Sequence, residues 1–228
     1  MSNAGTRDAS RFIVLEGVDG VGKSTQITLL SSWLAALGVP HVTTREPGGT
    51  PVAEAIREVV LGRDDLDVPP ESELFLILAA RAAFVRDVVR PALEEGRTVV
   101  ADRFSLSTLA YQGYGRGLDL KRVRNAIELS TGGLIPDLYL VLDLPVEESR
   151  KRQRKASGDG DRIERSGEDF RKAVRDGYLE LARTEPNVET VNARGTPEEV
   201  HRRIRDRLRV RFPGTFSPGQ ATEVDTAG

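Results

Sequence analysis

The stretch "RFIVLEGVDGVGKST", residues 11–25, decides the fold of this chain. It begins with a run of aliphatic and aromatic residues that is typical of a buried strand. The run leads into a glycine-rich loop, and a helical pattern follows directly at residues 24–37. A strand, a glycine-rich loop and a helix in this order predict the first unit of an α/β domain.

The loop in this stretch fits the spacing G-x-x-x-x-G-K-[ST], which ends at Lys23 and Ser24. Its glycines allow backbone N–H groups to turn toward phosphate oxygens, and the following helix adds the positive end of its dipole. The lysine is expected to reach the outer phosphates and the serine hydroxyl to bind Mg²⁺. We therefore predict a polyphosphate site formed by Gly17, Val18, Asp19, Gly20, Val21, Gly22, Lys23, Ser24 and Thr25.

The remainder of the chain repeats the alternation of strands and helices. Further short apolar runs without clean alternation, typical of strands covered on both faces, lie at residues 41–44, 98–102, 138–143 and 188–192. We predict an α/β fold with a doubly wound, five-stranded parallel sheet in a single domain, residues 11–211. The long helical pattern at 69–96 is expected to bend or break at Pro91. The polar residues 1–10 are expected to be flexible, and the Pro- and Gly-rich tail 212–228 disordered.

Composition excludes several classes of function. The 228 residues carry a net charge of −2, which argues against nucleic-acid binding, and contain no cysteine and two histidines. Disulfides, thiolate nucleophiles and Cys- or His-rich metal sites are therefore excluded. No segment is long and apolar enough to indicate a membrane span or a signal peptide, so we expect a cytoplasmic protein without a membrane partner.

Two further segments follow strands and carry charged residues. "TREPGGT" (44–50) follows the second strand, and "DRF" (102–104) ends the third. Because ligands of open α/β sheets bind at the carboxyl ends of strands, Asp102 and Arg103 are expected to face the ligand. Arginine suits bidentate phosphate recognition, so we assign Arg103 to a phosphate and Asp102 to the magnesium shell. The chain also lacks the N-K-x-D sequence of guanine-specific proteins, which argues against a GTPase.

Taken together, "EGVDGVGKST", "TREPGGT", "DRFSLSTLAYQG" and "DRIE" resemble the thymidylate kinase family from about Phe12 to about Leu208. The resemblance implies the Mg²⁺-dependent transfer of the γ-phosphoryl group of ATP to dTMP, giving ADP and dTDP, by a homodimer. A phosphate monoester dianion is already a competent nucleophile, so such an enzyme works mainly by positioning and charge neutralisation. The implied catalytic residues are Lys23, Asp102, Arg103 and Arg162, with Ser24 and Asp102 near the metal.

The resemblance also assigns residues to the acceptor. Asp19 is expected to bind the sugar 3′-OH, which gives an acid in an anion-binding loop a partner. Glu46 and Pro47 belong to the substrate loop, where a cis bond before the proline costs little. Arg57 and Arg103 are expected to hold the acceptor phosphate.

The base and sugar are expected to lie against a second group, Thr108, Tyr111 and Gln112. Arg81 is expected to reach the edge of the thymine, which explains a cation within the apolar run 74–85. The alternative is that Arg81 extends to solvent or pairs with Glu73 or Asp87 away from any pocket. Ile77 stands where the family usually has phenylalanine. It can pack on the base but loses a stacking contribution of about 1 kcal/mol, so base selectivity is the least secure part of the assignment.

Members of the family place a catalytic arginine either in the phosphate loop or in a lid. Here the loop position is Gly20, so we expect the lid, residues 154–167, to supply the cation from Arg154 or Arg162, with Arg162 preferred. Another nucleoside or nucleoside monophosphate kinase, and a non-catalytic nucleotide-binding paralogue, remain alternatives. The intact Lys23, Asp102 and Arg103 argue against the non-catalytic alternative.

Overall fold

The computed structural model describes residues 10–63, 65–157, 163 and 166–217. Its centre is a parallel sheet of five strands, which confirms the predicted fold class. The strands are β1 (Phe12–Glu16), β2 (His41–Arg45), β3 (Thr98–Asp102), β4 (Leu138–Asp143) and β5 (Val188–Asn192), in the order β2-β3-β1-β4-β5. All five coincide with the predicted apolar runs to within one residue at either end.

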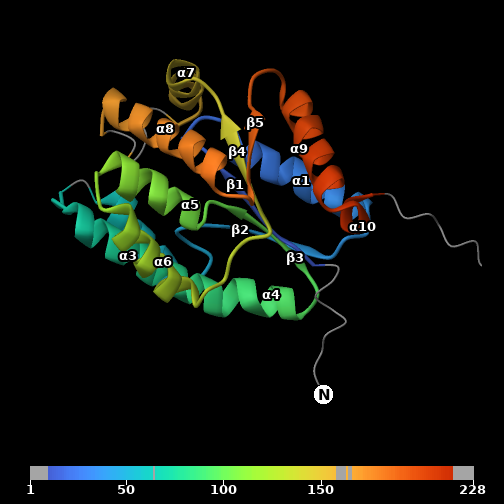
Figure 1. Ribbon diagram of the computed structural model, residues 1–228, viewed down its shortest axis with the longest axis horizontal. Coiled ribbons are helices and arrows are strands. Elements are labelled where there is room, and N and C mark those ends of the chain that lie inside the picture. Colours follow the sequence, from blue (N-terminus) through green and yellow to red (C-terminus); the bar gives the residue numbers. More distant parts are fainter. Residues whose placement is uncertain (1–9, 64, 158–162, 164–165, 218–228) are drawn as a thin grey trace, which may run out of the picture.

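Helices cover both faces of the sheet (Figure 1). One face carries α1 (Lys23–Ala36), α9 (Pro197–Arg211) and the short α10 (Pro213–Phe216). The other carries α3 (Pro70–Phe84), α4 (Arg90–Glu94), α5 (Ser105–Thr108), α6 (Leu120–Thr131) and α8 (Glu168–Thr184). The helix α2 (Pro51–Arg57) packs on α3, and α7 (Val146–Ser157) follows the carboxyl end of β4.

Strand register determines which polar side chains meet. Leu15 of β1 and Arg45 of β2 both align with Asp102 at the end of β3, and Glu16 aligns with Val141 of β4. The strand interiors are apolar and buried, so the sheet forms the centre of the hydrophobic core. Parallel strands therefore deliver Glu16, Arg45 and Asp102 to a common edge.

Three π-helical segments interrupt the helices: η1 (Glu58–Gly62), η2 (Val85–Val89) and η3 (Leu109–Gly115). The segment η2 lies directly before Pro91, where a helix break or bend was predicted. Proline has no N–H to donate to the preceding turn, and a π-turn is one way in which a helix accommodates the missing bond. The helix therefore continues into α4.

The prediction of a disordered tail is wrong for residues 212–217. The chain is ordered through residue 217, and Phe216 of α10 is fully buried with its ring 5.9 Å from that of Trp33. Arg11 lies over the ring of Phe212, 5.1 Å from its centre, and Ser10 is buried. The two aromatic residues of this segment provide apolar area that its Pro- and Gly-rich composition had concealed. Residues 1–9 and 218–228 lie outside the described part of the chain.

Among the described residues, we find no helix with the length and apolarity needed to cross a membrane.

Candidate active site

A cleft of about 740 Å³ opens at the carboxyl ends of the strands. Residues from segments far apart in the sequence line it, including nearly all of those predicted to bind ligands. These are Asp19, Gly20, Val21, Gly22, Lys23, Ser24, Thr25, Glu46, Pro47, Arg57, Ile77, Arg81, Asp102, Arg103, Thr108, Tyr111 and Gln112. The fold thus joins the phosphate loop to the predicted acceptor residues in one continuous cavity.

Backbone carbonyl groups of the phosphate loop hold its lysine in place. Lys23 is the first residue of α1, and its Nζ donates to the carbonyl oxygens of Gly17 (3.0 Å) and Val18 (3.2 Å). Burial and the nearby Arg103 charge lower the pKa of Lys23, while Asp19, with Oδ1 3.6 Å from Nζ, works in the opposite sense. Gly17 and Val18, which do not line the cleft, therefore serve the loop by orienting its cation.

Gly20 has no room for a side chain. Its φ is +83°, and a Cβ built there would overlap the carbonyl oxygen of Ser149 in α7. An L-residue is strained at this φ, and here the steric conflict is with backbone that cannot easily move. This close approach of α7 gives a physical reason why the phosphate loop carries no arginine at this position.

Arg103 is fixed by four polar partners. Its guanidinium donates to Asp19 Oδ1 (2.5 Å) and to the hydroxyls of Ser107 (3.1 Å), Tyr111 (3.0 Å) and Tyr178 (3.1 Å). Its φ of 72° is the one positive value at a non-glycine position in the described residues, and such strain persists where surrounding contacts over-determine it. Burial alone raises the pKa of Asp19, but the charges of Arg103 and Lys23 outweigh it and hold that pKa well below its usual range. Asp19 is therefore an anion within the phosphate loop.

A buried carboxylate, Glu16, supports this arrangement and was missed in the sequence. It accepts hydrogen bonds from the backbone N of Phe104 (2.9 Å), the Ser107 hydroxyl (2.6 Å) and the Tyr178 hydroxyl (2.9 Å). Burial raises the pKa of Glu16, although the Arg103 charge opposes the shift. An acid directly at the carboxyl end of a buried strand was the available signal. Glu16 fixes the turn after β3, which carries Arg103.

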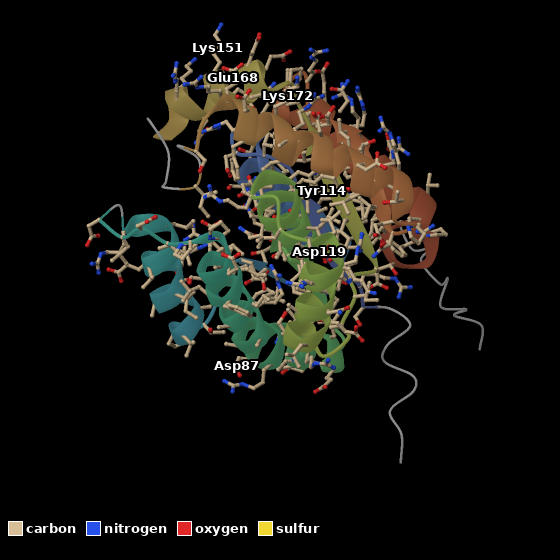
Figure 2. All side chains as sticks on the ribbon, turned by 60° about the vertical axis from the view of Figure 1, so that its left-hand side comes forward. Asp87, Tyr114, Asp119, Lys151, Glu168 and Lys172 are labelled. Atoms are coloured by element: carbon tan, nitrogen blue, oxygen red, sulfur yellow. The ribbon has the colours of Figure 1, made fainter. Side chains whose placement is uncertain are left out.

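Arg81 is buried inside the cleft wall, and its partner is neither of the two expected alternatives. It is 1% exposed and forms an ion pair with Glu46, with Nη2 2.7 Å and Nε 2.9 Å from Oε2. It also donates to Thr108 Oγ1 (2.8 Å) and to the Phe104 carbonyl (3.1 Å). Asp87 pairs with Arg86, and Figure 2 labels it at the lower edge of the molecule. Pairing of Arg81 with Glu73 or Asp87 is therefore wrong, because the fold brings "TREPGGT" against α3.

Glu46 is poised between two charge states. It is 4% exposed, and burial raises its pKa to about 7 because the Arg81 charge offsets only part of the cost. Its Oε1 accepts no hydrogen bond within the described residues. The Glu46–Pro47 bond is cis, as the sequence allowed. A buried carboxylate oxygen without a partner is a position where a bound ligand or metal can supply one.

The oxygen atoms beside the phosphate loop fit a magnesium ion. Ser24 Oγ lies 3.5 Å from Asp102 Oδ2, and Asp102 Oδ1 is buried and without a partner among the described residues. Mg²⁺ prefers such hard oxygen donors and usually keeps water and phosphate ligands. No cluster of three or more acidic or histidine side chains exists in the part of the chain that the structure describes, so protein ligands alone would not complete its shell.

Comparison with known proteins agrees with this arrangement. The family model described as "Thymidylate kinase" matches residues 15–204. The chain belongs to the thymidylate kinase family. A thymidylate kinase of Chlorobium luteolum is 48% identical over 210 residues, covering 88% of this chain and 98% of that protein. One from Syntrophotalea carbinolica is 47% identical over 201 residues, covering 86% and 93%.

A solved structure extends the likeness to three dimensions. The crystal structure of thymidylate kinase from Ehrlichia chaffeensis superposes with a TM-score of 0.71 at 31% sequence identity, covering 88% of this chain and 99% of that one. The five-stranded fold is thus shared with a member of the thymidylate kinase family. This chain is therefore an enzyme, and it is a phosphotransferase.

The structure places one of the two predicted lid arginines outside the main cleft. In this kinase Arg154 is exposed on α7 and borders a separate shallow depression together with Lys151 and Glu168, which Figure 2 labels on the outer surface. Arg152 and Gln153 line the main cleft instead, since helical phase turns successive side chains by about 100°. Arg162 lies outside the described residues, and Ile163, from the same segment, lines the cleft and is 6% exposed.

A further part of the cleft lining was not predicted from the sequence. It is formed by side chains of α1 and α7 and by the segment that follows β5, namely Gln26, Arg152, Gln153, Gly195, Pro197 and Val200. Arg152 donates to the Ala193 carbonyl (3.1 Å), which joins α7 to this segment. The position of "NARGTP" directly after the fifth strand was a usable signal, because loops at the carboxyl ends of parallel strands form ligand sites.

Proposed function

We propose that this enzyme transfers the γ-phosphoryl group of ATP to dTMP, giving ADP and dTDP. The observation that carries the proposal is the cleft, which joins a phosphate loop to a second wall holding Arg81, Arg103 and Gln112. One cavity of about 740 Å³ suits two substrates held end to end for direct transfer. Membership of the thymidylate kinase family supports the choice of substrates.

The donor lies at the phosphate loop. Lys23, oriented by two backbone carbonyls, faces the outer phosphates, and the first turn of α1 points its N–H groups at them. The apolar side chains of Pro197 and Val200 form a wall at the opposite end of this half of the cleft, where the adenine ring fits.

Magnesium completes the donor site. Ser24 and Asp102 would hold the ion. When bound, Mg²⁺ neutralises the charge that builds up on the phosphates during transfer.

The acceptor phosphate lies between Arg57 and Arg103. Arg57 Nη1 donates to the Pro47 carbonyl (2.9 Å), which ties its guanidinium to the substrate loop. Arg103 is already held by Asp19, Tyr111 and Tyr178, so it does not have to be ordered when the substrate binds. Two fixed guanidiniums can align an acceptor dianion with the γ-phosphoryl group, and no strong general base is required.

The nucleoside of the acceptor lies deeper in the cleft. Asp19 accepts a hydrogen bond from the sugar 3′-OH, and Tyr111 packs on the sugar where a 2′-OH would otherwise fit. Arg81 and Thr108, which are hydrogen-bonded to each other, face the base, and Ile77 packs on its ring. Arg162 remains the predicted lid cation that closes over the transferred group.

An ADP-release assay tests this function. Purified enzyme with ATP and Mg²⁺ is given dTMP, dUMP, dCMP, dAMP, AMP and thymidine in parallel, with EDTA as the metal-free control. We expect turnover to be fastest with dTMP and to stop in EDTA. Turnover with thymidine but not with dTMP would exclude a monophosphate kinase, and binding of ATP and dTMP without turnover would support a non-catalytic paralogue.

We also propose that the protein is a homodimer. Phe75 on α3 is 66% exposed and Val52 on the adjoining α2 is 55% exposed, which leaves apolar surface on the face opposite the sheet. Sedimentation velocity at micromolar concentration should give the mass of two chains, and Phe75→Glu should give one. A wild-type monomer would refute the proposal. The cytoplasmic location stays a prediction from the sequence.

A further inference from the structure

A buried acid outside the catalytic machinery lies behind the base-binding wall. Glu73 of α3 is completely buried, and its carboxylate faces η3. Its Oε1 accepts from Gln112 Nε2 at 2.9 Å. Arg116 binds both of its oxygens, with Nε 3.2 Å from Oε1 and Nη2 3.1 Å from Oε2. A fully desolvated carboxylate is costly unless it is paired and hydrogen-bonded in this way, so its placement here calls for a reason.

Glu73 determines which end of the Gln112 amide faces the cleft. A carboxylate only accepts hydrogen bonds, so the amide atom next to it must be the NH₂ group. The amide is planar, and its oxygen therefore points away from Glu73. Gln112 lines the cleft, is 1% exposed, and uses its side chain for no other hydrogen bond in the described part of the chain. The carbonyl oxygen of Gln112 is therefore an acceptor in the cleft wall, on the side of the amide away from Glu73.

Arg116, which binds Glu73, is itself held in place by aromatic contacts. The Arg116 guanidinium lies over the ring of Phe170, 4.6 Å from its centre, and Phe170 packs edge-on against Tyr111 with ring centroids 6.1 Å apart. The segment η3 approaches α8 closely here, and Figure 2 shows Tyr114 at this junction. Stacking on Phe170 and ion pairing with Glu73 together fix the Arg116 guanidinium next to the carboxylate.

We propose that Glu73 is a positioning residue for base selection: it holds Gln112 so that the cleft presents an acceptor beside the donors of Arg81. This inference rests on the proposed function. A pyrimidine with a carbonyl next to a ring N–H, as in thymine, matches that order of donor and acceptor. Cytosine presents the reverse order, an amino group next to a bare ring nitrogen, and leaves both protein groups unsatisfied.

Glu73→Gln tests the inference. A glutamine at this position can donate as well as accept, so the Gln112 amide is no longer held in one orientation. We expect kcat/KM for dTMP to fall about 10- to 100-fold, mainly through KM, because an acceptor is exchanged for a clashing donor. The dTMP/dCMP ratio of kcat/KM should fall by a similar factor, and KM for ATP should not change. Glu71→Gln, on the exposed side of the same helix, is the matched control and should behave as the wild type.

A mutant cycle separates positioning from general structural damage. In the Gln112→Leu background, Glu73→Gln should change the dTMP/dCMP ratio less than about twofold, since the side chain through which it acts is gone. An equally large effect in both backgrounds would overturn the inference. If Glu73→Gln does not fold, as judged by circular dichroism, Glu73→Asp keeps the charge but withdraws the acceptor from Gln112, and the same change in ratio is expected.

The two proposals fail differently. A wild-type enzyme without dTMP turnover would refute the proposed function. A wild-type enzyme that prefers dTMP, together with Glu73 variants of unchanged dTMP/dCMP ratio, would refute only the positioning role.

Discussion

The stability of this enzyme should fall as the pH rises through the titration of Glu46, and Glu46→Gln should remove that part of the fall. Burial raises the folded-state pKa of Glu46 from its ordinary 4.5 to about 7. In the pH range between these values the folded protein retains a proton that the unfolded chain has released. The free energy of unfolding therefore decreases as pH increases through this range.

The magnitude follows from the size of the shift. At about 1.4 kcal/mol per pKa unit, the change from 4.5 to about 7 corresponds to about 3 kcal/mol. The effect is absent below the unfolded-state pKa and complete above the folded-state pKa. Because the side chain is 4% exposed, solvent screening reduces this value little.

Urea unfolding at a series of pH values from about 4 to about 8 measures this contribution. Trp33 is the one tryptophan of the chain and is 8% exposed, so its fluorescence reports unfolding directly. We expect the wild type to lose about 3 kcal/mol more than Glu46→Gln over this range, with most of the difference between pH 4.5 and pH 7.

Comparison of slopes rather than absolute stabilities isolates Glu46. The glutamine variant places next to Arg81 an amide that does not titrate, so any cost of the replacement that is independent of pH shifts the whole curve and does not contribute to the difference in slope. Glu71→Gln, at an exposed position, should follow the wild type. Parallel curves for the wild type and Glu46→Gln would refute the reasoning.

Three further outcomes test other parts of the structure. Arg162→Ala should lower kcat by orders of magnitude with little change in dTMP affinity, whereas Arg154→Ala should stay within about twofold of the wild type; equal effects in steady-state assays would contradict the placement of Arg154 outside the cleft. Phe216→Ala should cost about 3 kcal/mol in urea unfolding, because it empties a buried contact with Trp33; a cost below about 1 kcal/mol would mean that α10 is not docked in solution. Ile77→Phe should tighten dTMP binding about fivefold by calorimetry through ring stacking, and unchanged affinity would show that this position does not face the base.

Local patterns were sufficient for the elements of the fold. The five strands, the phosphate loop and the helix after it follow from short apolar runs and from one spaced motif, and each depends on residues close together in the sequence. The same rule placed Asp102 and Arg103 at the cleft, because the end of a parallel strand is recognisable without knowing its neighbours. Ile77 and Arg81 both line the cleft, because side chains four residues apart lie on the same face of a helix.

The sequence did not predict features that depend on the rotation of a helix about its axis or on a contact with a residue distant in the chain. Arg154 and Arg152 are indistinguishable by composition, and only the phase of α7 against the sheet decides which of them reaches the cleft. The tail was misjudged because two aromatic side chains count for little in composition but bury fully once Trp33 lies beside them.

The sequence by itself determined a parallel α/β fold with a phosphate loop, since those features follow from periodicity and spacing along the chain. Only the tertiary structure decided how its buried charges are paired. Arg81 meets Glu46 across 35 positions, and Glu73 meets Gln112 across 39. A buried charge is tolerated only where the fold brings a partner to it, and that partner comes from packing and not from sequence proximity.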